Sequence, residues 1–256
     1  MPPIIEGSLD AKGLKWAMAF NFRASPVVRH ARKLVKDGVI GRLLEMRARG
    51  KEDARSGGED LIVLGVHEFD LMRYFAGDPT WCEAEVLVYD RPVTRADVRE
   101  ATEPLGPVVG DTIHARWGFA NGVRGYFASV KGAEGGGGRW GVDLYGDRGV
   151  ITIRMHPIPQ VRWFASPNWT KDADILIWQS LRDEPVVELP DSPAGHYQPI
   201  VDDLIASITE NREPFTSVRD GRAAQEFVQA VFETQVSGGR VAMPLKDRTH
   251  PLERWS

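Results

Sequence analysis

The chain has 256 residues and a formal net charge of -4, and its hydrophobic content of 42% and charged content of 27% are ordinary for a globular protein. The net charge and the lack of any Lys/Arg run argue against nucleic acid as a partner, and the single cysteine excludes an intrachain disulfide. Because no apolar run approaches the roughly 20 residues of a membrane span and the first residues lack a signal-peptide pattern, we expect no membrane partner and a cytoplasmic location.

The first twenty residues have the pattern of a helix, a glycine and a strand. Residues 9–12 are typical of a last helical turn, Gly13 of its C-cap, and residues 15–20 of a strand. This is the closing piece of an alternating α/β unit, whose strand normally lies between parallel neighbours. We therefore expect this segment to depend on packing against other elements.

A helix and a strand follow. Ser25 and Pro26 predict a helix start and Gly38 its end, because serine is a favoured N-cap and proline fits the first helical position. The alternation of apolar and charged residues over 44–49 predicts a half-buried strand.

The polar loop at residues 50–59 has two open interpretations. It is either a solvated loop or a lid over a polar substrate. In the second case Arg49, Lys51 and Arg55 are the candidate contacts for hydroxyl or carboxylate groups.

Residues 65–76 show the strongest helical periodicity in the chain. The apolar part is wide enough that the helix must be nearly surrounded, yet His67 and Asp70 lie three residues apart on its polar side, which makes them neighbours. A titratable pair on a largely buried helix needs satisfied partners or a chemical role. His67 is therefore either a core histidine bonded to a carbonyl or a site residue. Its place in the first turn, at the positive end of the helix dipole, favours a neutral base.

The middle of the chain is predicted to be antiparallel sheet. Two hairpins are expected, with strands at 112–119 and 123–130 around Asn121-Gly122, and at 140–145 and 150–154 around residues 146–149. The glycine run 136–141 satisfies Gly-x-Gly-x-x-Gly, but a strand and not a helix is expected after it, so we interpret it as a loop and not as a nucleotide site.

The C-terminal third ends in two helices. One begins at Pro199 with apolar residues on one face, and the next is capped by Ser217 and Asp220 and ends at Gly238. A short strand at 241–245 follows. Trp163, Trp169 and Trp178 either stack on sugar rings or fill the sheet face. The predicted fold is α+β, a mainly antiparallel open sheet with helices on one face, preceded by a truncated Rossmann remnant.

Five residues of the central stretch carry a family resemblance. Gly57, Gly58, Gly65, His67 and Asp70 resemble the Gly-Gly, Gly-x-His-x-x-Asp motif of the Gfo/Idh/MocA oxidoreductases, and the C-terminal end is also similar. The resemblance implies an NAD- or NADP-dependent enzyme acting on a sugar, cyclitol or similar polyol. It also implies that residues 1–23 are a remnant of the dinucleotide-binding domain and that 24–256 form the substrate and oligomerisation domain.

The resemblance also implies roles for single residues. His67 would be catalytic, Asp70 would orient the imidazole or hold substrate, and Asn21 and Arg23 would match a cofactor-binding element. The aspartate that many members carry four residues before the histidine is Val63 here. Residues 1–8 contain neither the phosphate-binding turn nor the Glu-Lys-Pro lysine, so we expect this chain alone to bind no cofactor and to be inactive.

Two other functions and an assembly state complete the sequence-based expectations. The alternative to an enzyme is a non-catalytic ligand-binding or assembly module that lacks the cofactor half. Metal-dependent hydrolysis using His67, Glu68 and Asp70 is the weakest option, because no second histidine stands at a ligand spacing, and we expect no metal. A sheet covered on one face leaves an apolar face bare, which predicts a homo-oligomer through that face.

Overall fold

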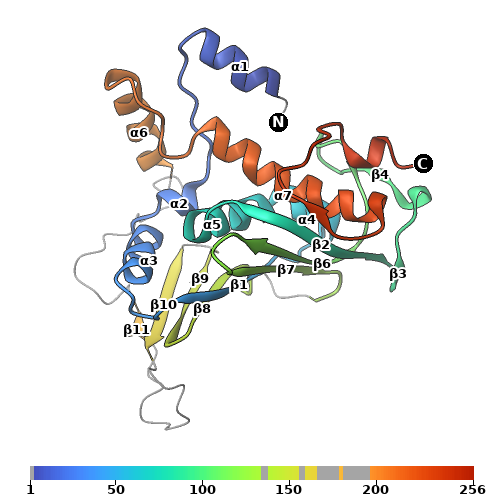
Figure 1. Ribbon diagram of the computed structural model, residues 1–256, viewed down its shortest axis with the longest axis horizontal. Helices are drawn as coiled ribbons and strands as arrows, with labels where there is room; N and C mark the ends of the chain where they lie inside the picture. The colour runs from blue at the N-terminus through green and yellow to red at the C-terminus, as the bar shows by residue number, and fades with distance from the viewer. Residues whose placement is uncertain (1–2, 134–137, 156–158, 166–178, 181–196) are drawn as a thin grey trace.

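The computed structural model describes residues 3–133, 138–155, 159–165, 179–180 and 197–256 (Figure 1). Its helices are α1 (Pro3–Ala11), α2 (Asn21–Ala24), α3 (Pro26–Lys36), α4 (Gly58–Val63), α5 (Gly65–Ala76), α6 (Gln198–Thr209) and α7 (Val218–Ser237), with 3-10 turns at η1 (Arg95–Asp97) and η5 (Pro251–Glu253). The main sheet contains β1 (Leu43–Arg49), β2 (Pro79–Val88), β3 (Arg91–Pro92), β6 (Thr112–Phe119), β7 (Arg124–Val130), β8 (Gly141–Gly146), β9 (Gly149–Arg154), β10 (Gln160–Ala165), β11 (Gln179–Ser180) and β12 (Val241–Ala242). The strands β4 (Arg99–Glu100) and β5 (Pro107–Val108) form a separate small pair.

The main sheet is mixed. Its order is β11-β10-β9-β8-β1-β7-β6-β2-β12, with β3 beside β2. Strand β1 runs parallel to β7 and antiparallel to β8, and the other pairings among the described strands are antiparallel. The α+β fold is thus confirmed, and the sheet departs from pure antiparallel pairing only where β1 enters it. That strand is followed by helices and not by a hairpin, which permits a parallel neighbour.

Both predicted hairpins are present. Strands β6 and β7 are joined through Asn121-Gly122, where Gly122 has φ +86°. Strands β8 and β9 meet at the Gly146–Gly149 pair. The glycine run leads into β8, which supports its interpretation as a loop; its residues 136 and 137 lie outside the described residues.

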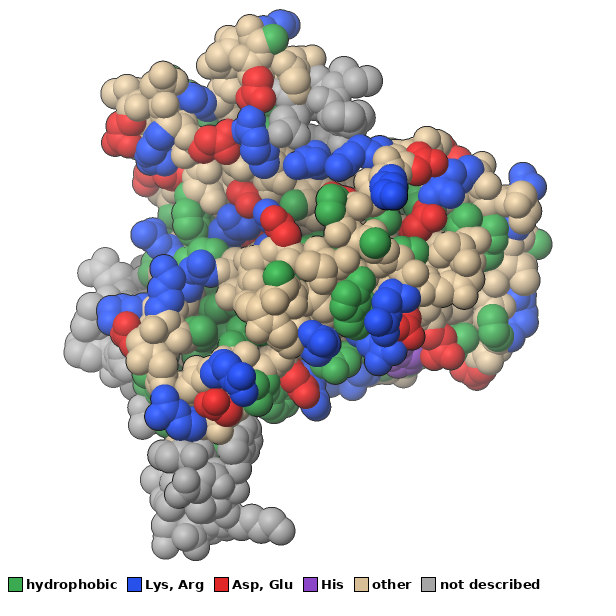
Figure 2. Space-filling model, viewed as in Figure 1, with side chains coloured by type: hydrophobic (Ala, Val, Ile, Leu, Met, Phe, Trp, Pro, Cys, Tyr) green, Lys and Arg blue, Asp and Glu red, His purple; other side chains and the backbone are tan. Residues whose placement is uncertain are grey.

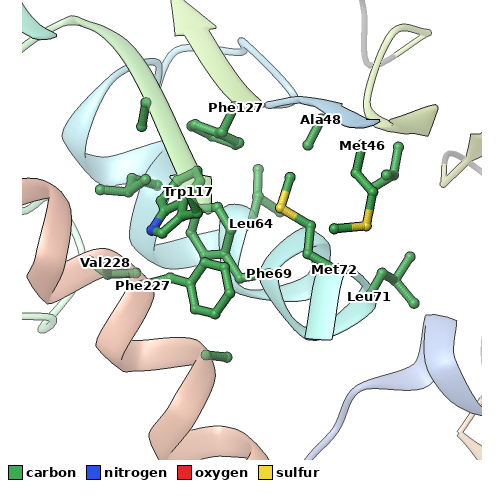
Figure 3. Packing of buried hydrophobic residues seen from close by; sticks show 14 of the residues in the cluster. Met46, Ala48, Leu64, Phe69, Leu71, Met72, Trp117, Phe127, Phe227 and Val228 are labelled. Atoms are coloured by element: carbon green, nitrogen blue, oxygen red, sulfur yellow. The ribbon is translucent and has the colours of Figure 1, made fainter. Parts of the chain in front are cut away.

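Helices cover one face of the sheet. Figure 1 shows α4, α5 and α7 together on that side. Their apolar side chains meet the sheet in a core in which Phe69 of α5 lies 5.1 Å from Trp117 of β6 and 5.2 Å from Phe227 of α7 between ring centroids (Figure 3). The three rings are fully buried. This cluster holds α5 between the sheet and α7.

The opposite face of the sheet, here called the open face, is charged and not apolar. Alternation along β1 buries Met46 and Ala48 against the helices and turns Arg47 and Arg49 outward. A cavity of about 510 Å³ lies on this face, and Glu83, Glu85, His114, Arg116 and Asp143 also line it. The expected bare apolar face is therefore wrong, because these strands alternate in polarity as antiparallel strands with one solvated face do.

Three other predicted elements differ from the structure. Residues 15–20 form no strand, and the backbone there makes only an isolated bridge between Ala17 and Ser217, because no described strand lies beside it. Helix α6 exposes much of its predicted apolar face, and β12 is shorter than expected. Trp163 is buried in β10, whereas Trp169 and Trp178 lie outside the described residues.

The ends of α7 follow their predicted chemistry, whereas the predicted N-cap Ser25 precedes α3 without a side-chain capping hydrogen bond among the described residues. Ser217 and Asp220 form the capping box of α7, and Gly238 ends that helix with φ +74°. On the face in Figure 2, acidic and basic side chains are interspersed, without an expanse of one sign over its described part. No helix in the described part of the chain is long and apolar enough to cross a membrane.

The aromatic core generates a stability prediction. Phe69→Ala removes a fully buried ring, so we expect the free energy of unfolding to fall by about 3–5 kcal/mol. Leu44→Ala, at a side chain that is 38% exposed in the same fold, is expected to change it by no more than about 0.5 kcal/mol. Urea denaturation of both variants measures the difference. Equal losses in the two variants would show that α5 does not depend on this core.

Candidate functional site

His67 lies in the first turn of α5. Gly65 begins α5, and a Cβ atom added to it would lie 3.2 Å from the ring of Phe69 and 3.4 Å from that of Phe127. The glycine therefore lets the helix start close against the core. This close approach places the His67 side chain at the end of the sheet where β1 ends and β8 begins.

Three aromatic rings surround the imidazole. Ring centroids of Phe20, Phe22 and Trp140 lie 5.8, 5.2 and 6.4 Å from that of His67, all in edge-to-face arrangements. Phe22 and Trp140 also pack edge-to-face at 5.3 Å. We call these three rings the aromatic cage. It provides apolar walls beside the imidazole.

The cage makes His67 a neutral base. Burial lowers the pKa of the His67 imidazole to about 4, from an ordinary value of 6.5. Its Nδ1 atom is buried and has no hydrogen-bond partner among the described residues. The interpretation of His67 as a core histidine requires a carbonyl partner, and the described part of the chain gives Nδ1 none. A neutral imidazole with a free ring nitrogen is suited to accept a proton from a hydroxyl group.

Asp70 is bound by Arg23 and not by His67. Arg23 donates from Nε to Asp70 Oδ2 at 2.9 Å and from Nη2 to Oδ1, and both side chains are buried. Burial raises the pKa of Asp70 to about 7, although Arg23 acts in the opposite direction. The expected pairing of Asp70 with the imidazole is therefore wrong in this structure, because the nearer arginine takes both carboxylate oxygens.

Arg23 is committed to a network that joins three helices. Besides Asp70 of α5, it bonds Asp220 of α7 at 3.1 Å and the carbonyl oxygen of Phe215. Asp220 also accepts from Arg73 at 2.8 Å. With these partners Arg23 fixes α2 against α5 and α7. Its predicted contact with a cofactor stays a prediction, as does that of Asn21, whose buried Oδ1 has no partner among the described residues.

Of the three predicted basic contacts, only Lys51 lies near the cage. Its Nζ is 6.0 Å from the ring centroid of Trp140. Arg49 lines the cavity on the open face and pairs with Glu52 at 3.0 Å. Arg55 pairs with Asp53 at 2.7 Å and with Glu103 at 3.2 Å. The structure therefore does not bring Arg49 and Arg55 together with His67.

The sequence-based analysis missed the site residues Trp140, Phe20 and Phe22, and it named Glu68 only as part of the metal-hydrolysis alternative. Trp140 adjoins the glycine run, and Phe22 lies between the two residues singled out for the cofactor, so only their neighbours carried a signal. Glu68 follows His67 directly and is fully buried. Burial, reinforced by nearby Asp60, raises the pKa of Glu68 well above its ordinary range. This shift favours the uncharged form of its carboxyl group.

The described residues at this site fit a substrate better than a dinucleotide. Pyrophosphate binding requires a glycine-rich turn at a helix N-terminus, and the described glycines Gly138 and Gly141 lead into strand β8. Within the described ranges, no group of three or more His, Cys, Asp or Glu side chains is placed to hold a metal ion. What the cage offers is a neutral base between apolar walls.

Comparison with known proteins places most of the chain in one domain type. Residues 32–243 match the model of the C-terminal alpha/beta domain of the Gfo/Idh/MocA oxidoreductases. A levoglucosan dehydrogenase of Pseudarthrobacter phenanthrenivorans is 27% identical over an alignment of 166 positions that covers 56% of this chain and 43% of that protein. An uncharacterized oxidoreductase of Synechocystis is 24% identical over an alignment of 250 positions that covers 90% of this chain and 65% of that protein. The chain thus matches 43% and 65% of the lengths of these two relatives.

Solved structures share the fold. Levoglucosan dehydrogenase in complex with NADH and levoglucosan superposes with a TM-score of 0.71 at 21% identity, covering 93% of this chain and 69% of that one. An NAD-binding oxidoreductase from Klebsiella pneumoniae gives a TM-score of 0.72 at 15% identity, covering 96% and 70%.

The buried imidazole predicts a pH dependence of stability. As pH falls, the unfolded chain takes up the His67 proton near pH 6.5 and the folded chain only near pH 4. This contribution is thus fully present above pH 6.5 and is lost on acidification between 6.5 and 4, by about 3 kcal/mol. Urea unfolding across this range compares the parent chain with His67→Gln, which should lack this part of the slope. His114→Gln on the open face is the control and should retain it. A slope that persists in His67→Gln would contradict the burial of a neutral imidazole.

Proposed function

Because this chain belongs to the Gfo/Idh/MocA family of oxidoreductases, we propose that it forms the substrate-binding part of an NAD- or NADP-dependent oxidoreductase that acts on a sugar, cyclitol or similar polyol. Relatives support this substrate class. Levoglucosan dehydrogenase was solved with NADH and levoglucosan or L-sorbose, and an aldose-aldose oxidoreductase from Caulobacter crescentus with glycerol.

The observation that carries the proposal is the neutral imidazole of His67, which is partly exposed beside the aromatic cage and whose buried Nδ1 has no hydrogen-bond partner among the described residues. A hydroxyl group of the substrate would lie within hydrogen-bond reach of the imidazole, which accepts its proton as the carbon that bears it is oxidised. A nicotinamide cofactor, when bound, supplies the acceptor for the hydride that leaves that carbon. Reduction of a carbonyl reverses this order, and the imidazolium returns the proton.

The cage determines what kind of molecule is held against His67. Aromatic faces pack on the apolar C–H faces of a sugar ring, and they exclude water from the base. Lys51, beside the Trp140 ring, contributes a cation at the edge of the cage that suits a hydroxyl or other oxygen. Since Asp70 is paired with Arg23, we assign the substrate contacts to Lys51 and the cage. Val63 stands where many family members carry an aspartate, and we assign the role of that aspartate to no described carboxylate.

Exposed apolar side chains near α1 and α6 are evidence that a cofactor-binding domain packs there. Leu14 and Trp16 are 55% and 44% exposed, and along α6 Val201, Ile205 and Ile208 are 48%, 59% and 61% exposed. Apolar stripes of this kind mark interfaces. We infer that residues 1–23 contribute to this interface and that the cofactor is bound mainly by the domain that covers it.

The proposed role of His67 is tested by substitution. We expect His67→Asn, in a fusion with the cofactor-binding region of levoglucosan dehydrogenase, to lower kcat with a polyol substrate by about 10²–10⁴-fold, because general acid–base catalysis is lost. His114→Asn on the open face is the matched control and should leave kcat unchanged. The readouts are turnover per folded molecule and melting temperature. A lower melting temperature with normal turnover would show that His67 has a structural role, and it would favour the alternative of a non-catalytic binding module.

Association through the open face is a second prediction. Glu83 on β2 is ion-paired with Arg116 on β6 at 2.9 Å, and Glu85 lies beside His114. The acidic and basic side chains thus form neighbouring columns on this face, and a two-fold axis can bring each column opposite the other. We expect a homodimer at micromolar concentration by sedimentation equilibrium. Arg116→Glu should shift it toward monomer, whereas Lys36→Glu on α3 should not. A monomeric parent chain, or dissociation by both variants alike, would contradict this interface.

A further inference from the structure

Two buried polar groups beside His67 lack hydrogen-bond partners. The Glu68 side chain is fully buried and Trp140 is only 6% exposed. The two carboxyl oxygens of Glu68 make no hydrogen bond to any described residue, and the Nε1 atom of Trp140 makes none either. Buried donors and acceptors are nearly always paired in folded proteins, so an unpaired donor close to an unpaired acceptor requires an explanation.

The two groups face each other across the junction of α5 and β8. The Trp140 indole N–H and the Gly141 amide both point toward the Glu68 carboxyl group and favour its charged form, although without hydrogen-bond geometry. Burial outweighs both effects and raises the pKa of the carboxyl group. In either protonation state the carboxyl group keeps an acceptor oxygen, and the indole N–H can only donate.

The two other acidic side chains near Glu68 already accept hydrogen bonds. Asp60 accepts from the Ser129 hydroxyl at 2.6 Å and from the Glu52 amide at 3.1 Å. It therefore offers the indole no better acceptor than Glu68. Glu52 is likewise occupied, since it accepts from the Val130 amide at 2.9 Å.

The backbone next to Trp140 is fixed, so the position of its ring depends on the contacts of the indole. Gly141 has φ +150°, and a Cβ atom there would lie 2.0 Å from the carbonyl oxygen of Ile153 in the neighbouring strand. The chain is thus held close against β9, and the remaining freedom is in the Trp140 side-chain torsions. That ring borders both His67 and Phe22, so its orientation sets the shape of the cage.

We propose that Glu68 is a positioning residue whose carboxyl group accepts a hydrogen bond from the Trp140 indole N–H and thereby fixes the ring that borders His67. In the ligand-free chain, small side-chain adjustments bring the two groups into hydrogen-bond geometry. Glu68 acts through Trp140 and touches no reacting atom. Only the consequence for substrate orientation rests on the proposed function.

The test follows the Trp140 indole N–H by NMR in the full chain without sugar or cofactor. The signal is assigned among the eight tryptophans by its loss in Trp140→Phe. We expect Glu68→Gln to keep the indole shift, because the amide oxygen still accepts a hydrogen bond. Glu68→Leu should move it toward the position of a free indole and should also move the His67 ring signals. Val142→Ala, next to Gly141, is the control for general loosening and should move neither.

Each outcome decides the proposal. Equal indole shifts in Glu68→Leu and in the parent chain would overturn it, and so would equal displacement in Glu68→Gln and Glu68→Leu. If Glu68→Leu does not fold, the parent chain decides alone, since a bonded indole N–H shows a small temperature dependence of its shift and a free one a large dependence. Because no substrate is present, failure here leaves the proposed function standing, and that function is tested separately by His67→Asn.

Discussion

The burial of α5 between the mixed sheet and α7 is the constraint on which the rest of the structure depends. Phe69 anchors the helix in the aromatic core, and Gly65 lets its first turn approach that core closely. The same packing buries Glu68 and Asp70 completely and leaves His67 only partly exposed. Each of these groups must then be neutral or paired, because an isolated buried charge costs several kcal/mol.

The three groups meet this demand in different ways. Asp70 is paired with Arg23, which in turn holds α2 and α7, so this part of the site is structural support. Burial lowers the pKa of His67 and raises that of Glu68, so each shift favours the uncharged form. Opposite pKa shifts in neighbouring groups are typical of functional sites.

Local chemistry made much of the fold predictable. Helix α5 was expected at its observed bounds because its periodicity, its leading glycine and the closing Gly77 agree. The Asn121-Gly122 hairpin and the capping box at Ser217 rest on equally local signals. The strand at 15–20 was not formed because a strand needs partners, which periodicity does not reveal. The parallel entry of β1 and the charged open face likewise depend on which strands become neighbours.

The site was predictable only in part, for the same reason. His67 carried a motif, but the walls of its cage come from segments far apart in the chain, at Phe20, Phe22 and Trp140. Asp70 was expected beside His67 because both lie three residues apart, yet Arg23, 47 residues away in sequence, takes its carboxylate. Helical spacing shows which side chains can meet on one helix. Tertiary packing decides which of them do.

The central claim is that this chain carries a substrate site at His67 while most of the dinucleotide site lies outside its described residues. Its most direct test is a titration of the isolated chain with levoglucosan and, separately, with NADH, followed by NMR of the His67 and Trp140 rings and by calorimetry. The account predicts that the sugar shifts both ring signals and that NADH binds no more tightly than about millimolar, or about -4 kcal/mol. Micromolar binding of NADH, or sugar-induced shifts confined to the open face, would contradict it.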